Sequence, residues 1–304
     1  MDFVTIKADL EALNIGQILE DEPMYKHTTF KVGGPAKLYI KVNSIDSLEK
    51  VLTYCKQNEV EYIVIGKGSN LLFSDKTYNG IIVSLNSFIN QYHINGSIIT
   101  ADAGVSMINL AYEAAKVGLS GFEFMGGIPG TIGGGVYMNA GAYNYDIASV
   151  VKAVTVLNEN LEIVTLSHED MRFSYRHSIL QEKQQWIVLS ATFKLSAGDP
   201  KKIKEILDER KERRMSSQPW NLPSAGSVFR NPAQKSAWHY IDAAGLRGYT
   251  IGGAQISPKH SNFIVNNGYA SAKDIYELIT YTKKKVKDKF DIELQQEVCF
   301  INWE

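Results

Sequence analysis

Seven glycines lie in the stretch GGIPGTIGGGVYMNAGA, from Gly126 to Gly141 and Ala142, so this segment has few side chains that could do chemistry. Glycine permits positive φ angles and lets another molecule lie directly against the main chain. No charged residue occurs from Gly126 to Tyr145, and an anion bound here would therefore be held by backbone N–H groups. We predict that a phosphate-bearing cofactor lies on this segment. The alternative interpretation is a tight, buried glycine-rich turn that packs against a helix.

A second candidate phosphate-binding segment, GKGSN, runs from Gly66 to Asn70 directly after the apolar run YIVI. Its two glycines, hydroxyl and amide offer exposed N–H groups and short polar side chains that suit a pyrophosphate. The string does not match the Rossmann fingerprint, because Leu71 stands where the third glycine belongs and no acidic residue lies between Asp75 and Asp102. A Walker A sequence is also missing. An NAD-type Rossmann domain is therefore disfavoured.

Two further residues could act on a substrate. Arg176 in FSYRHSIL carries a permanently charged guanidinium that can bind a carboxylate through two parallel hydrogen bonds. From this string alone, a surface arginine is the favoured interpretation. Ser227 lies in QPWNLPSAGSVFRNP, a proline-rich loop that could present one hydroxyl rigidly, although such a serine is more often a turn former.

These candidates need regular elements to position them, and hydrophobic periodicity predicts such elements. The alternation KLYIKV at residues 37–42 predicts a strand, and Ser44 can cap a helix with apolar residues at helical spacing up to Cys55. The run YIVIG then completes a βαβ unit, in which ligands meet the loop after the second strand. That loop is GKGSN.

The rest of the chain is predicted to alternate between strands and helices. The sequence SAKD, from Ser271 to Asp274, is a capping box that introduces the last long helix. Residues 251–266 are predicted to form a loop. Strands are predicted at residues 80–85, 97–104, 148–158, 162–167, 186–196 and 291–302, and helices at residues 105–120, 201–216, 236–246 and 272–288.

Composition limits the classes of protein to which the chain can belong. Its 304 residues, 44% of them hydrophobic, can bury a large core, and the formal net charge of −1 shows no electrostatic footprint for nucleic acid. Acidic residues interrupt the N-terminal stretch where a signal peptide needs an apolar run, and no later run is long enough to span a membrane. We expect a cytoplasmic protein. Cys55 and Cys299 are the only cysteines and lack metal-ligand spacing, so we expect no metal site.

Seven strings between His27 and Asn302, taken together and in order, resemble the UDP-N-acetylenolpyruvoylglucosamine reductases. This family belongs to the flavoproteins of the vanillyl-alcohol-oxidase type. The resemblance implies an α+β fold with two FAD-binding subdomains, residues 1–85 and 86–200, and a substrate-binding domain, residues 201–304. The strings are HTTFKVGGPA, GKGSN, GIPGTIGGGVYMNAGAY, SYRHSIL, PSAGSVFRNP, IGGAQISPKHSNFIVN and LQQEVCFIN.

The resemblance also implies a reaction in peptidoglycan synthesis. NADPH reduces FAD, and hydride then passes to the enolpyruvyl double bond of a UDP-sugar, giving UDP-N-acetylmuramate. By position in the family strings, Arg176 would bind the substrate carboxylate, Glu297 would assist in stabilising the enol form, and Ser227 would donate a proton. A serine hydroxyl is a poor acid, so this last role requires a highly activated intermediate and a fixed donor.

The same resemblance implies where the ligands bind. Tyr175 would line the substrate site, with Asn231, Lys259 and His260 as weaker candidates for the UDP moiety. The residues expected to contact FAD lie in the two glycine-rich segments. They are Gly66, Lys67, Gly68, Ser69, Asn70, Leu71, Gly126, Gly127, Ile128, Pro129, Gly130, Thr131, Gly133, Gly134, Asn139 and Gly141.

Two departures from the family pattern matter. Only residues 179–185 separate Ser178 from Trp186, so the chain is similar to the shorter branch, type II, which lacks a tyrosine-bearing insertion that folds over substrate. Asn70 stands where relatives that attach flavin covalently commonly have histidine, and we therefore expect non-covalent FAD. Two other functions are kept as alternatives: another flavin oxidoreductase of the superfamily that acts on an alcohol or sugar, and a catalytically silent nucleotide-binding protein.

Overall fold

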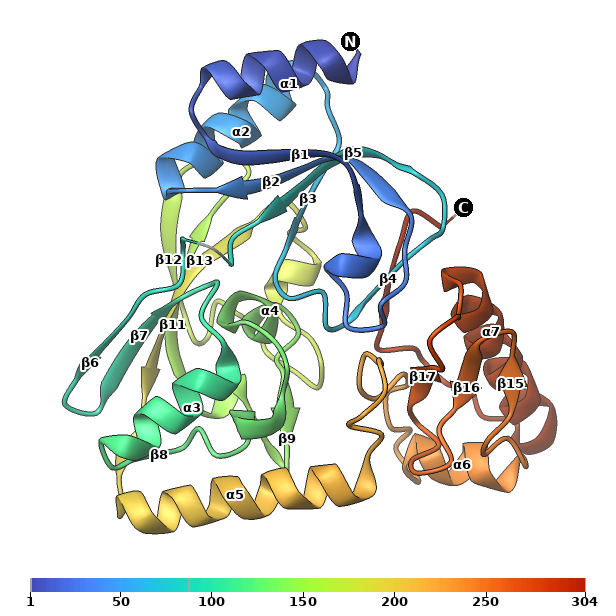
Figure 1. Cartoon of the computed structure of the whole chain (residues 1–304). Coiled ribbons are helices and arrows are strands. Elements are labelled where there is room, and N and C mark those ends of the chain that lie inside the picture. The colour runs from blue at the N-terminus through green and yellow to red at the C-terminus, as the bar shows by residue number, and fades with distance from the viewer. Residues whose placement is uncertain (1, 87, 304) are drawn as a thin grey trace. The chain divides into compact units, whose positions relative to one another are not determined.

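The computed structural model describes residues 2–86 and 88–303, which divide into two compact units (Figure 1). Unit 1 consists of Met1–Glu20, Lys37–Lys67 and Asn79–Glu212. Unit 2 consists of Asp21–Ala36, Gly68–Tyr78 and Arg213–Glu304. Both units are built from segments that are discontinuous in the sequence, and the division into three consecutive domains remains a prediction.

Unit 1 contains a four-stranded sheet in the order β1-β2-β5-β3, formed by Gly16–Pro23, Pro35–Val42, Tyr78–Ser84 and Tyr62–Ile65. Strands β3 and β5 are parallel. Helix α1 (Phe3–Ala12) and helix α2 (Ile45–Gln57) lie next to each other, since the Tyr54 hydroxyl donates to Asp9 at 2.8 Å (Figure 1). Ser44 caps α2 as predicted, with its side chain accepting from the N–H of Ser47. The predicted succession of strand, helix and strand is therefore present, and β5 lies between the two strands in the sheet.

The second sheet of unit 1 is antiparallel and has the order β12-β11-β13-β7-β6. Apolar residues of both sheets and of α1, α2 and α3 form one buried cluster. Threonine pairs cross neighbouring strands, Thr100 with Thr192 and Thr155 with Thr165. The strands are β6 (Tyr92–Asn95), β7 (Ile98–Asp102), β11 (Val151–Leu157), β12 (Ile163–Ser167) and β13 (Ile187–Lys194).

Three helices accompany this sheet: α3 (Met107–Lys116), α4 (Ile132–Tyr137) and α5 (Pro200–Ser217). The sequence predicted a helix over residues 105–120, but α3 ends at Lys116. Gly118 adopts a φ of +71°, and Leu119 and Ser120 form the short strand β8, which pairs with β14 (Ser196–Ala197). A positive φ is incompatible with continuing a right-handed helix. Short strands β9 (Gly141–Ala142) and β10 (Tyr145–Asp146) pair after α4.

Unit 2 is built around helix α7 (Ala272–Phe290) and a three-stranded antiparallel sheet. The predicted capping box of α7 is present, with Ser271 and Asp274 bonding reciprocally. Residues 251–266, predicted as a loop, contribute strands to this sheet, because a chain that folds back pairs its own backbone groups. The elements are α6 (Ala237–Ala243), β15 (Thr250–Ile251), β16 (Ala254–Ile256) and β17 (Ile264–Asn266).

Early segments of the chain complete unit 2. Strand β4 (Leu71–Phe73) pairs in parallel with β18 (Cys299–Ile301). Asp75 accepts from the N–H groups of Ala272 and Lys273, both at 2.9 Å, at the start of α7. A separate buried cluster joins Phe30 and Leu72 to α6 and α7. The closing strand is thus shorter than residues 291–302, because regular pairing begins only at Cys299.

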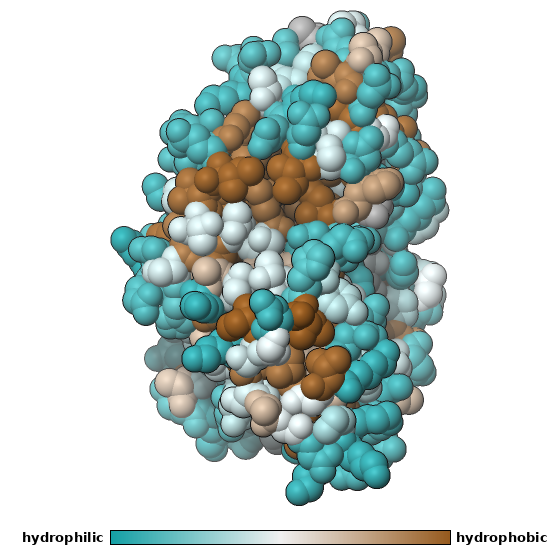
Figure 2. All heavy atoms as spheres, turned by 90° about the vertical axis from the view of Figure 1, so that its left-hand side faces the viewer, coloured by the Kyte–Doolittle hydropathy of each residue, from teal (hydrophilic) through white to brown (hydrophobic). Residues whose placement is uncertain are grey.

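The surface seen from the left of Figure 1 is mainly hydrophilic, with an apolar area above its middle (Figure 2). A large part of any folded surface is apolar, so this area by itself does not identify an interface. In the part of the chain that is described, no helix combines the length and apolar character of a membrane span.

Candidate active site

The two predicted phosphate-binding segments touch each other within unit 1. A Cβ placed on Gly66 would lie 2.5 Å from Oγ1 of Thr131, a distance that real side chains do not adopt. The carbonyl of Gly66 also accepts from the side-chain amide of Asn86 at 3.0 Å. Lys67 lies beside these groups and donates to the Ser106 hydroxyl at 3.1 Å, and burial lowers the pKa of its amine. Gly66 is therefore required by close packing against the other segment.

Most glycines of the 126–141 segment also pack against protein. A Cβ on Gly126 would meet Leu207 at 2.4 Å, one on Gly133 would meet Ala103 at 2.9 Å, and one on Gly135 would meet Met107 at 2.6 Å. The buried-turn interpretation thus accounts for these three positions. Gly134 differs from them. It is exposed, and the single atom within 4 Å of its added Cβ, among the described residues, is Thr131 Oγ1 at 3.6 Å.

Many backbone N–H groups of this segment already have acceptors. The N–H of Ile132 donates to Val105, that of Gly133 to Ala103 and that of Gly135 to Thr131, at 2.8–2.9 Å. The N–H of Gly134 makes a longer contact of 3.4 Å with its helix cap, Thr131. Over residues 66–70, by contrast, the described part of the chain provides no backbone acceptor for the N–H groups. The GKGSN loop and Gly134 are therefore places where a phosphate could find donors.

Asn139 and Asn70, predicted to contact the cofactor, direct their side-chain amides into the protein. Asn139 is 1% exposed and donates to the carbonyl of Ser174 at 2.9 Å and to Asp146 at 3.1 Å. Asn70 donates to the carbonyl of Glu297 at 3.0 Å. Asn139 therefore links the 126–141 segment to the loop that carries Arg176. Asn70 links the GKGSN loop to the backbone of Glu297.

Arg176 belongs to unit 1, in the loop between β12 and β13. Its guanidinium donates to the carbonyl of Gly141 at 2.9 Å and lies 5.1 Å from the ring centroid of Tyr175. Tyr175 is 52% exposed, so the tyrosine can contact a ligand without rearrangement. Stacking on an aromatic face and a fixed hydrogen bond both orient the planar cation.

Ser227 and Glu297 both belong to unit 2, and the structure brings their backbone segments together. The N–H of Glu297 donates to the carbonyl of Val228 at 2.7 Å, and Phe229 pairs with Gln296. Ser227 itself pairs with Phe263. Asn262 fixes the same strand, because its side chain accepts from the N–H of Phe229 and donates to the Phe229 carbonyl.

The charges near this pairing act on Cys299. Burial raises the pKa of the Cys299 thiol, Glu297 raises it further, and Arg230 opposes both effects. Arg230 was not among the predicted site residues, since nothing in the string FRNP distinguishes it from a surface arginine.

The weaker substrate candidates have structural partners in unit 2. Asn231 accepts from the N–H of Ala237 at the start of α6, and Lys259 donates to the carbonyl of Met215 at 2.8 Å. His260 packs edge-on against Phe263, and burial lowers the pKa of its imidazole. Its Nδ1 accepts from the N–H of Asn262, which leaves Nε2 as the protonated nitrogen of the neutral ring.

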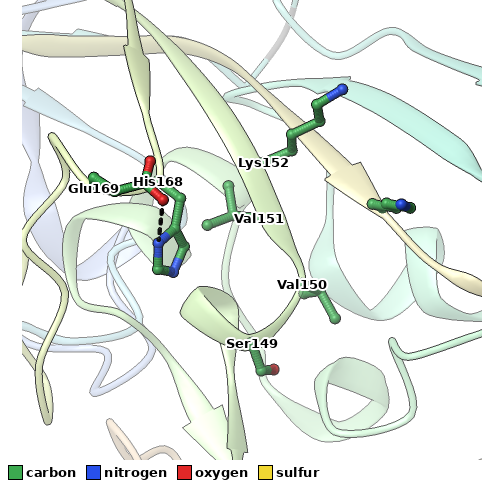
Figure 3. A pocket seen from close by; sticks show the side chains of 7 residues that line it. Ser149, Val150, Val151, Lys152, His168 and Glu169 are labelled. Atoms are coloured by element: carbon green, nitrogen blue, oxygen red, sulfur yellow. Dashed lines mark ion pairs between the residues drawn. The ribbon is translucent and has the colours of Figure 1, made fainter.

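A hollow of about 470 Å³ lies elsewhere on unit 1 (Figure 3). It is lined by the start of β11, by Lys194 and by His168, whose ring lies 4.0 Å from the carboxylate of Glu169. None of the predicted site residues lines it.

Comparisons with known proteins match both parts of the chain. Residues 36–167 match the family model described as an FAD binding domain, and residues 218–301 match the C-terminal domain of UDP-N-acetylenolpyruvoylglucosamine reductase. A protein of that name from Anoxybacillus flavithermus is 44% identical over 96% of this chain and 97% of its own length. Another from Caldanaerobacter subterraneus is 46% identical over 96% of both. The chain belongs to the UDP-N-acetylenolpyruvoylglucosamine reductase family.

A solved member of the reductase family has the same fold. The crystal structure of the enzyme from Thermus caldophilus matches with a TM-score of 0.79 and 33% identity, covering 93% of this chain and 98% of that one. The family and the α+β fold with an FAD-binding domain, both predicted from the sequence, are therefore confirmed. The roles assigned to individual residues remain predictions.

FAD, which the reductase family requires, fits the residues present in unit 1. Exposed Gly134 leaves room beside its backbone that a side chain would fill, and Lys67 places a cation on the neighbouring segment. The glycine segment itself has no charged residue from Gly126 to Tyr145, so backbone N–H groups are its donors to an anion. These residues would hold an anionic group such as a pyrophosphate.

Proposed function

We propose that this chain is an FAD-containing, NADPH-dependent reductase. It converts UDP-N-acetylglucosamine enolpyruvate into UDP-N-acetylmuramate, a step of peptidoglycan synthesis. The observation that carries the proposal is the 44% identity to a reductase of this family over 96% of the chain. FAD is bound without a covalent link, the enzyme acts in the cytoplasm, and nucleic acid is not a partner.

When bound, FAD would supply hydride transfer from NADPH to the substrate. The protein has to bind and polarise the enolpyruvyl group. Hydride arriving at the methylene carbon moves the electron pair of the double bond toward the carboxylate, where an enolate-like charge develops. Arg176 binds that carboxylate through its planar guanidinium, and Glu297 assists at the enol stage.

Ser227 completes the reduction by donating its Oγ proton to the carbon next to the carboxylate, and solvent then restores the hydroxyl. General acid catalysis requires a donor held within hydrogen-bond reach of the accepting atom. The backbone pairing of Ser227 with Phe263 and of Val228 with Glu297 supports this role, because it fixes the serine beside Glu297.

The test is an anaerobic titration of the purified protein. Its oxidised-flavin absorption band should bleach on addition of NADPH and return when the enolpyruvyl UDP-sugar is added, with UDP-N-acetylmuramate as the product. A protein without flavin, or a reduced flavin that this substrate leaves reduced, would contradict the proposal.

A further inference from the structure

The backbone of Arg176 has an unusual conformation. Its φ of +56° lies in the left-handed region, which residues other than glycine, asparagine and aspartate rarely adopt. Such a conformation persists only when the surroundings impose it, and imposed strain is characteristic of functional segments. The contacts of residues 174–181 therefore show what fixes the arginine.

Gln181 supports the arginine from one side. Its Nε2 donates to the carbonyl of Arg176 at 3.0 Å and to the carbonyl of Tyr137 at 3.1 Å. A side-chain amide has two N–H donors, so Gln181 links the arginine backbone to the end of α4. Ser178 adds a parallel link, since its hydroxyl donates to the same Tyr137 carbonyl at 2.8 Å.

Asn139 supports the loop from the other side. Its Nδ2 donates to the Ser174 carbonyl, and its Oδ1 accepts from the N–H of Ala148 at 3.0 Å. Ser174 and His177 pair through two backbone hydrogen bonds, which close a tight turn around Arg176. Asn139 itself has a φ of +42°, a conformation that asparagine tolerates better than most residues.

The head of the arginine is fixed on the same stretch of chain, because Gly141 accepts from its Nη2. Residues 137, 139 and 141 thus hold the backbone of the arginine loop and the guanidinium together. Sequence reasoning singled out Asn139 as a cofactor contact and did not identify Gln181, because the string LQEKQQ does not distinguish it from its exposed neighbours.

We propose that Gln181 and Asn139 are positioning residues that hold the guanidinium of Arg176 in place for the substrate carboxylate. The inference rests on the proposed function, since it takes Arg176 as the carboxylate-binding group. Neither amide touches the reacting atoms. Loss of the Gln181 amide should weaken recognition of the carboxylate while leaving reduction by NADPH intact, because pre-organisation lowers the cost of binding.

The test compares Gln181→Met, which keeps side-chain length but removes both donors, with Gln184→Met on the exposed part of the same loop. We expect Gln181→Met to raise the KM for the enolpyruvyl substrate about 10-fold, as loss of one or two net hydrogen bonds would. The inhibition constant of UDP-N-acetylglucosamine, which lacks the carboxylate, should stay unchanged. Gln184→Met should match the wild type in both measurements.

Two further variants separate positioning from a general structural role. In an Arg176→Lys background, Gln181→Met should add little, because residues that act through one group are not additive. Asn139→Asp retains the Oδ1 acceptor but replaces the donor, and should likewise raise the KM for the enolpyruvyl substrate. An unchanged KM in Gln181→Met, or equal losses for both ligands, would overturn the inference. Failure of the wild-type enzyme to reduce the substrate would instead contradict the proposed function.

Discussion

The N–H of Glu297 donates a hydrogen bond of 2.7 Å to the carbonyl of Val228, the residue that follows Ser227. Two predicted catalytic residues from distant parts of the sequence therefore lie on paired backbone segments. Because the bond uses main-chain atoms, either side chain can be replaced without removing it. This makes both residues suitable for mutational tests of chemistry.

Glu297→Gln should lower kcat roughly 10²-fold or more, because the amide keeps the size of the side chain but removes its ionisable group. Thermal stability should change little. Turnover with saturating NADPH and substrate, together with the melting temperature, checks this prediction. Glu293→Gln is the matched control, since Glu293 is an exposed residue that pairs with Lys287 at 3.2 Å. Near-normal turnover in Glu297→Gln would leave this residue without a catalytic role.

Arg176→Lys should remain impaired although it keeps the positive charge. The lysine cannot form two parallel hydrogen bonds with a carboxylate, and hydrogen bonds to charged groups contribute about 1.5–3 kcal/mol each. We expect kcat/KM to fall by roughly 10- to 100-fold. Arg172→Lys provides the control, because Arg172 also has a positive φ, +47°, and lies four residues earlier in the same loop. Equal activity in the two variants would count against a carboxylate site at Arg176.

Helices α2 and α7 could be predicted from the sequence because capping residues and apolar spacing are local signals. Ser44 and Ser271 cap α2 and α7 as their side chains predict, and the apolar spacing of α2 buries Leu48 and Val51. The extent of the closing strand was not readable, since its partners, β4 and Val228, are distant in sequence. Pairing between segments that are far apart in the chain produces no periodic pattern in the sequence of either segment.

The site was predictable only in part for a related reason. A string shows that Asn70 and Asn139 can donate hydrogen bonds, but the acceptors, Glu297 and Ser174, follow from the fold. Likewise, the sequence gives Gly133 and Gly134 as equivalent, whereas their surroundings differ.

Gly134→Ala should therefore change the affinity for FAD, whereas Gly133→Ala should change the stability of the fold. Alanine at 134 meets no close protein atom and favours the helix by up to about 1 kcal/mol, so stability should hold while FAD binds about 10-fold or more weakly. Alanine at 133 would press against Ala103 and cost about 1–3 kcal/mol of stability. Denaturant unfolding of the apoprotein and fluorescence titration with FAD measure both effects. Wild-type FAD affinity in Gly134→Ala would place the cofactor elsewhere.

His260 should contribute to the pH dependence of stability. Burial lowers the pKa of His260 in the folded chain, whereas in the unfolded chain it is about 6.5. The unfolded chain therefore binds more protons below about pH 6.5, and the free energy of unfolding decreases as the pH falls through that window. In His260→Gln this decrease should be shallower, while exposed His93→Gln should keep it. Identical pH profiles for wild type and His260→Gln would refute the prediction.

The most direct test of the proposed reaction follows the two half-reactions of Ser227→Ala separately by stopped-flow absorbance. Bleaching of the flavin band by NADPH should proceed at nearly the wild-type rate, because the serine hydroxyl acts only on the enolpyruvyl substrate. Return of the band on mixing with that substrate should slow roughly 10²- to 10⁴-fold, the range typical of a lost general acid. Equal slowing of both phases, or none in the second, would contradict proton donation by Ser227.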